Sequence, residues 1–96
     1  MNQRPDTLRR RFRIHGRVQG VGFRAWCWQK AVALQLEGTV RNNPDGTVEV
    51  EATGDPAAMD GLAQALTRGP RHARVDRVAE LPPGTDPLPA EFRIVG

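Results

Sequence analysis

The residues best suited to chemistry lie in a glycine-rich segment, residues 16–24, with the sequence GRVQGVGFR. Its glycines allow a sharp turn whose backbone N–H groups point outward at the positive end of a following helix, and such a loop can bind an anion. The guanidinium of Arg24 can bind two phosphate oxygens at once. The spacing alone leaves two interpretations open, a phosphate cradle or an ordinary strand-to-helix turn, because the segment lacks the Gly-Lys-Ser/Thr ending of a nucleotide-binding loop.

Four other side chains could take part in catalysis, and each has a simpler explanation. His15 and His72 fall at a strand end and in a loop without a paired carboxylate pattern, so we expect structural or solvent-facing roles. Cys27 lies on the apolar face of a predicted helix, where inert packing is expected. Asp45 precedes a glycine between two strands, which is typical of a hairpin turn.

The elements that must position these residues follow from hydrophobic periodicity. Strands are expected over residues 8–15, 38–42, 47–53 and 73–81, with a short final strand over residues 91–95 after a proline-rich loop, residues 82–89. Helices are expected over residues 23–36 and from Asp55-Pro56, a good N-cap and first position, to Gly69-Pro70. Because Trp26 and Trp28 are two residues apart on the first helix, they cannot both face the core, and we expect one to be partly exposed.

This order, β-α-β-β-α-β with an extra strand at the end, predicts an α+β fold. The specific architecture is a ferredoxin-like sandwich, in which two helices cover one face of an antiparallel sheet. We expect a polar N-terminal tail over residues 1–7 and a single domain over residues 8–96.

Composition fits one small domain that acts on an anion. The chain has 96 residues, of which 39% are hydrophobic, and a formal net charge of +3. Its single cysteine excludes an intrachain disulfide and a multi-cysteine zinc site, and is consistent with a cytoplasmic protein. We expect no membrane partner, because the chain has no run of about 20 apolar residues and no apolar signal segment.

Two motifs carry a resemblance to a known family. The segment IHGRVQGVGFR, residues 14–24, and the segment GTVRN, residues 38–42, followed by DGTVE at 45–49 and Gly54, resemble the signatures of the acylphosphatase family. The resemblance extends from about Arg9 to the end of the chain. One position departs, because Thr39 stands where the family usually has an aromatic residue, which affects packing or substrate contacts.

The resemblance implies an enzyme that hydrolyses the carboxyl–phosphate bond of acyl phosphates by in-line attack of water, yielding carboxylate and inorganic phosphate. It implies no metal and no cofactor, and we expect a monomer. By the same resemblance, Arg24 is the catalytic residue that binds phosphate, and Asn42 positions the attacking water. The phosphate cradle is then the backbone of Gln19, Gly20, Val21, Gly22 and Phe23.

Two alternative functions share this fold, an RNA-binding module of the RRM type and a ligand-sensing domain. RRMs stack bases on aromatic residues of the first and third strands. Here the solvent face of the third strand carries Glu49 and Glu51 and no aromatic residue, so we expect no nucleic-acid partner. We expect these glutamates to pair instead with Arg9, Arg11 and Arg13 on the neighbouring first strand.

Overall fold

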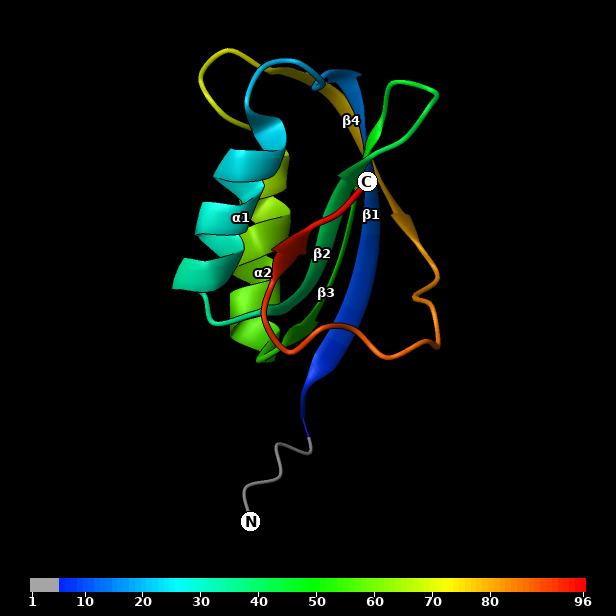
Figure 1. Ribbon diagram of the computed structural model, residues 1–96. Helices are drawn as coiled ribbons and strands as arrows, with labels where there is room; N and C mark the ends of the chain where they lie inside the picture. The colour runs from blue at the N-terminus through cyan, green and yellow to red at the C-terminus, as the bar shows by residue number, and fades with distance from the viewer. Residues whose placement is uncertain (1–5) are drawn as a thin grey trace.

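The fold is a sheet covered on one face by two helices (Figure 1), as the sequence predicted. The computed structural model describes residues 6–96, so most of the tail expected at residues 1–7 lies outside the described residues. The elements in chain order are β1 (Leu8–Arg17), α1 (Phe23–Ala33), β2 (Glu37–Asn42), β3 (Val48–Gly54), α2 (Pro56–Leu66), β4 (Arg74–Leu81) and β5 (Arg93–Ile94).

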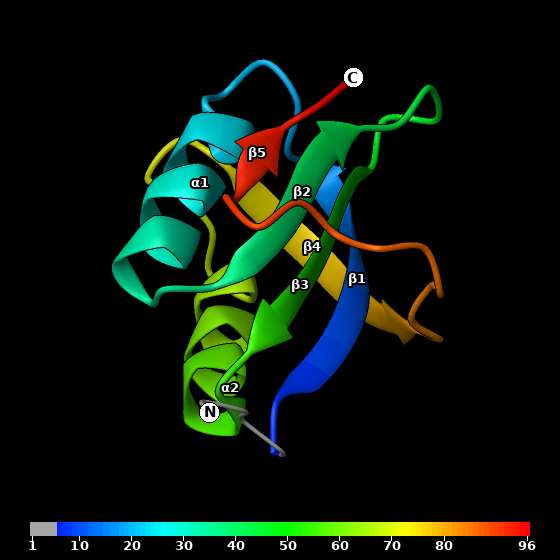
Figure 2. The same cartoon turned by 60° about the horizontal axis from the view of Figure 1, so that its bottom comes forward.

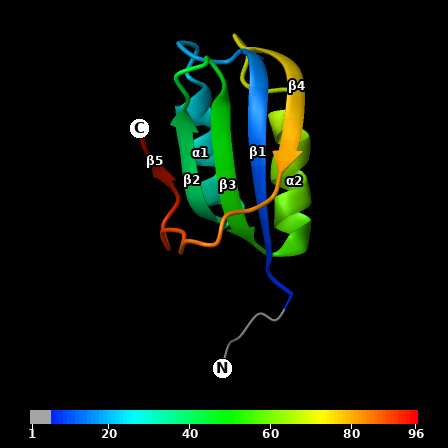
Figure 3. The same ribbon diagram turned by 90° about the vertical axis from the view of Figure 1, so that its right-hand side faces the viewer.

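The strand order in the sheet is β4-β1-β3-β2-β5. The pairs β1–β3, β1–β4 and β2–β3 are antiparallel, which confirms the ferredoxin-like arrangement of the four long strands. The short β5 pairs parallel to β2, with Thr39 opposite Arg93, so the complete sheet is mixed. The segment that leads from β4 to β5 crosses the helix-free face of the sheet (Figure 3).

Alternation along the strands separates a buried face from a charged face. Phe12 and Ile14 of β1 lie opposite Val50 and Val48 of β3, and all four side chains are buried beneath the helices. Each such side chain contributes about 1.5–3 kcal/mol by leaving water. The arginines of β1 point to the opposite face. The helices complete the core with Phe23, Cys27 and Ala31 of α1 and Met59, Leu62, Ala65 and Leu66 of α2.

The end of α1 differs from the expected one. The helix ends at Ala33 rather than at residue 36, because Gln35 adopts a left-handed backbone with φ of 59°. The N–H of Leu36 then bonds back to the carbonyl of Ala31 at 2.9 Å and the Leu36 side chain is buried. This turn starts β2 one residue earlier than expected.

The beginning of the glycine-rich loop also differs. We expected the loop to begin at Gly16, but β1 continues to Arg17 through a register shift between His15 and Gly16. Gly16 has φ of 133°, and a side chain there would collide with the carbonyl of Arg74 on β4. The first glycine of the motif therefore serves strand pairing, and the loop that can bind an anion is residues 18–22.

Candidate active site

The loop before α1 leaves backbone donors free at the start of the helix. Gly20 and Gly22 have φ of 75° and 80°, a left-handed conformation that glycine adopts at little cost. Gly22 is the N-cap of α1, and in the described part of the chain no side chain caps the helix there. The first turn contains no acidic residue. The positive end of α1 is thus open to an external anion.

The Gln19 side chain holds this loop against the β2–β3 hairpin. Its Nε2 donates hydrogen bonds to the carbonyl oxygens of Asn43 at 2.8 Å and Thr47 at 2.9 Å. The sequence interpretation gave Gln19 only a backbone role and missed this anchor. Val18, which is 1% exposed, fixes the start of the loop in the core.

One cavity of about 230 Å³ brings the main candidates together. Arg24 from the first turn of α1 and Asn42 from the end of β2 both line it. Two cradle residues, Gln19 and Val21, do not line it; Val21 packs instead against the core. The complete lining is Val18, Gly20, Gly22, Phe23, Arg24, Ala25, Asn42 and Ile94.

Ile94 is a lining residue that sequence reasoning missed. It lies in β5, which pairs with β2 next to Asn42 and approaches the first turns of α1 (Figure 2). The motifs of the sequence contained no signal for this contact, because it depends on where the last segment joins the sheet.

The Asn42 amide has a free acceptor. Its Oδ1 is buried and finds no hydrogen-bond partner within residues 6–96. The next residue, Asn43, is by contrast occupied, since its Nδ2 donates to Thr47 Oγ1 at 3.0 Å and Glu49 Oε1 at 3.1 Å. A buried acceptor without a partner costs about 1–3 kcal/mol, so Asn42 Oδ1 is suited to a guest molecule that donates a hydrogen bond.

The other candidate reactive residues lie outside this cavity. Cys27 is fully buried, and burial raises the pKa of its thiol to about 12. Asp45 accepts hydrogen bonds from the backbone and hydroxyl of Thr47, which lower the pKa of its carboxyl group, as expected of a turn residue. His15 accepts or shares a 3.1 Å contact with Arg77, and His72 is exposed in a loop.

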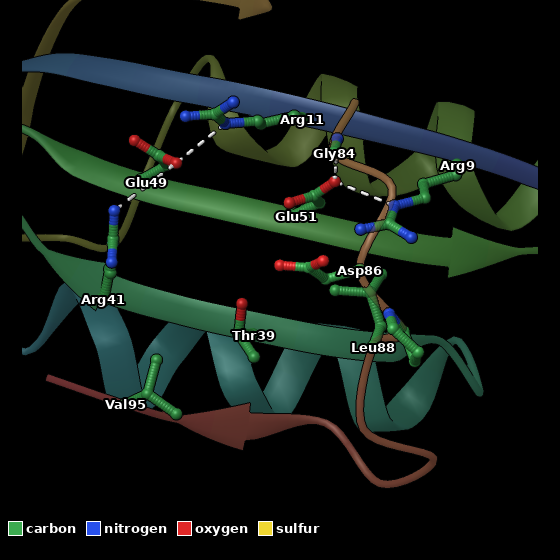
Figure 4. A pocket seen from close by; sticks show the side chains of 11 residues that line it. Arg9, Arg11, Thr39, Arg41, Glu49, Glu51, Gly84, Asp86, Leu88 and Val95 are labelled. Carbon is green, nitrogen blue, oxygen red and sulfur yellow. Dashed lines mark hydrogen bonds and ion pairs between the residues drawn. The ribbon is translucent and has the colours of Figure 1, made fainter. Parts of the chain in front are cut away.

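The charged face of the sheet carries the expected ion pairs. Arg9 pairs with Glu51 at 2.8 Å, and Glu49 pairs with Arg11 at 2.8 Å and Arg13 at 3.2 Å (Figure 4). Burial alone would raise the pKa of the Glu49 carboxyl, but hydrogen bonds from Arg11, Asn43 and Arg13 outweigh it and hold this pKa below its usual value. These arginines are engaged within the protein.

A second cavity, of about 310 Å³, lies on this charged face. It shares no lining residue with the Arg24 cavity, although it is larger. Thr39 lines it (Figure 4), so the position that departs from the family pattern lies away from Arg24 and Asn42. The departure changes the helix-free face and leaves the candidate site intact.

Two further searches covered residues 6–96. Within that range, no group of three or more His, Cys, Asp or Glu side chains is arranged to hold a metal ion. None of the helices described there is long and apolar enough to cross a membrane.

Comparison with known proteins places this geometry among related chains. The profile of the Acylphosphatase family matches residues 10–94. The chain is 46% identical over 81 residues to an acylphosphatase of Azorhizobium caulinodans, covering 84% of this chain and 87% of the relative. It is 48% identical over 88 residues to one of Nitratidesulfovibrio vulgaris, covering 90% and 88%. The crystal structure of acylphosphatase from Bacillus subtilis superposes with a TM-score of 0.83 at 31% identity, covering 92% of this chain and 98% of that one.

Proposed function

The chain belongs to the acylphosphatase family, and from that premise we propose that Arg24, Asn42 and the loop backbone of residues 19–23 perform its reaction. The protein hydrolyses the carboxyl–phosphate bond of acyl phosphates to carboxylate and inorganic phosphate, which is the activity of the family. The observation that carries the assignment of residues is the single cavity lined by Arg24, Asn42, Gly20 and Gly22.

Arg24 and the loop bind the phosphate group of the substrate. The guanidinium pairs with two phosphate oxygens, while the free N–H groups at the start of α1 donate to the same group. Phosphoryl transfer passes through a loose transition state, and catalysis depends on placement and on stabilisation of charge on the phosphate oxygens. Donors that are already fixed by Gln19 and by the glycine conformations need little rearrangement during the reaction.

Asn42 holds the attacking water. Its free, buried Oδ1 accepts a hydrogen bond from the water and fixes it for attack in line with the scissile P–O bond. An amide has no useful basicity, so Asn42 orients the water without deprotonating it. A phosphate oxygen of the substrate takes the proton that the water loses.

The leaving group explains why no general acid and no metal ion are required. The departing oxygen belongs to a carboxylic acid, whose pKa is near 4, so it leaves as a carboxylate at neutral pH without a proton. Arg24 and the backbone donors supply the positive charge that a metal would otherwise provide. The whole cavity comes from one chain, and we propose that the enzyme works as a cytoplasmic monomer without a nucleic-acid partner.

The test is hydrolysis of benzoyl phosphate by the purified protein, with and without EDTA. We expect unchanged activity in EDTA, and losses of about 10²–10³-fold in kcat for Asn42→Ala and at least as much in kcat/KM for Arg24→Ala. Matched controls are Asn43→Ala, whose side chain is already hydrogen-bonded, and Arg71→Ala, an exposed arginine in another loop. Activity that disappears with EDTA, or a full-rate Arg24→Ala enzyme, would overturn the proposal.

A further inference from the structure

The described residues expose few large apolar side chains, and most of those lie close to the candidate site. They are Leu8, Trp28, Val32 and Ile94, with exposures of 40–45%. Leu8 lies at the start of β1, whereas Trp28 and Val32 follow Arg24 along α1 and Ile94 lines the Arg24 cavity. An apolar surface gathered beside a polar active site indicates a site for an apolar part of a ligand.

Helical spacing aligns two of these side chains with Arg24. Residues four apart lie one above the other on the same face of a helix, so Arg24, Trp28 and Val32 form one row along α1. With a rise of 1.5 Å per residue, Trp28 lies about 6 Å and Val32 about 12 Å along the helix axis from Arg24. The row therefore leads away from the bound phosphate group.

The segment that leads into β5 forms the opposite wall. A cavity of about 410 Å³ lies between this segment and α1, lined by Trp28, Val32, Ala90 and Phe92 among others. Trp28 Nε1 donates a 2.9 Å hydrogen bond to the carbonyl of Phe92, which fixes the indole between the two walls. Ile94, two residues beyond Phe92, belongs to the Arg24 cavity, so the two cavities adjoin along β5.

We propose that this groove, formed by Trp28, Val32, Ala90, Phe92 and Ile94, binds the acyl chain of the substrate and selects apolar, uncharged acyl phosphates. The inference rests on the proposed function, because it takes the phosphate group to be bound at Arg24. An acyl chain is covalently attached to that phosphate and must leave the cavity along a neighbouring surface. The groove offers an apolar surface next to the cavity.

The charges at the far end of the groove add a second preference. Glu37 and Glu91 line the same cavity as Val32 and Phe92. A carboxylate at the end of an acyl chain would approach these two acidic groups and be repelled, while an aliphatic or aromatic chain would not. The groove therefore distinguishes acyl phosphates of equal length by the charge of their far end.

The first test is a series of acyl phosphates with the wild-type enzyme. Full burial of a methylene improves binding about fourfold, and a half-open groove gives about twofold. Hexanoyl phosphate, with four more methylenes than acetyl phosphate, is then expected to show about a tenfold lower KM at similar kcat, because the chain is bound equally in ground and transition states. Butyryl phosphate should have a several-fold higher kcat/KM than succinyl phosphate. Equal KM values along the series would overturn the inference.

Variants distinguish the groove from a general preference for apolar ligands. Trp28→Ala and Val32→Ser should remove most of the gain in KM for hexanoyl phosphate and leave the hydrolysis of acetyl phosphate unchanged. Leu8→Ser is the matched control, since Leu8 has the same 40% exposure as Trp28 but lies outside the groove. Loss of the gain in Leu8→Ser as well, or its retention in both groove variants, would contradict the proposal.

Two further results separate the groove from the active site and from self-association. If Arg24 does not bind the phosphate, Arg24→Ala will hydrolyse acetyl phosphate normally, and it is then the proposed function that fails. If a second copy of the chain covers the groove, the protein will sediment as a dimer at assay concentration, and Val32→Ser will make it monomeric without changing chain-length selectivity. That outcome would overturn the acyl-binding role; a monomer that retains selectivity supports it.

Discussion

Replacement of Gly22 by alanine tests the loop most finely, because the structure predicts a change of conformation without a clash. A Cβ built on Gly22 meets nothing within 4 Å, so the substitution adds no steric overlap. Its cost is the left-handed backbone, φ of 80°, which is about 1–2 kcal/mol for a residue with a side chain. For a domain of this size, that corresponds to a fall in Tm of about 4–8 °C per kcal/mol.

The expected functional effect of Gly22→Ala exceeds its effect on stability. Relaxation of the backbone toward negative φ turns N–H groups at the start of α1 away from the phosphate. Loss of one hydrogen bond to a charged group costs about 1.5–3 kcal/mol, or about 10–100-fold in phosphate affinity. The assays are thermal unfolding and competitive inhibition by inorganic phosphate.

Gly46→Ala provides the matched control. Gly46 has φ of 93° and equally open space around a built Cβ, but it lies in the β2–β3 hairpin turn and does not line the Arg24 cavity. We expect a similar fall in Tm and near-normal phosphate affinity. The reasoning is refuted if the two variants lose phosphate affinity equally, or if Gly22→Ala binds phosphate as tightly as the wild-type protein.

Three other predictions concern the surroundings of the site. Gln19→Ala should raise the KM for benzoyl phosphate about tenfold, because two hydrogen bonds that fix the loop are lost; an unchanged KM would contradict the anchoring role. Cys27 should not react with a thiol reagent at pH 8 in the native protein, since burial raises its pKa to about 12, and rapid labelling without unfolding would argue against this burial. Glu49→Gln should lower the free energy of unfolding by about 1–2 kcal/mol at pH 7, because it breaks pairs with partly exposed arginines. A lowered carboxyl pKa stabilises the fold above the unfolded value and ceases to do so as pH falls through the folded value, so the difference in Tm from wild type should shrink below about pH 4.

The element order and the charged face could be predicted from the sequence because both depend on local patterns. Alternation along residues 8–15 and 47–53 separated buried from exposed side chains, and the ion pairs of Glu49 and Glu51 followed once the two strands were neighbours. Asp55 caps α2 as expected, accepting from the N–H of Ala57 at 3.1 Å. Each of these features needs only a few adjacent residues and the strand order.

Features that depend on distant contacts could not be predicted in the same way. The β1 strand extends past Gly16 because β4 approaches it closely, and no residue near Gly16 in the sequence indicates this. The helix boundary at Ala33 depends on the left-handed Gln35, a rare conformation for a residue with a side chain. Ile94 and Phe92 reach α1 only through the long segment after β4, so the groove wall that they form had no signal in the motifs.

The most direct measurement of the central claim is a calorimetric titration of inorganic phosphate into three proteins: wild type, Arg24→Ala and Asn42→Ala. Because Arg24 holds the phosphate group and Asn42 holds only the water, we expect Arg24→Ala to lose measurable binding. Asn42→Ala should bind phosphate with wild-type affinity while its turnover of benzoyl phosphate falls by about 10²–10³-fold. Wild-type phosphate affinity in Arg24→Ala, or a loss of affinity in Asn42→Ala equal to its loss of turnover, would contradict this division of roles.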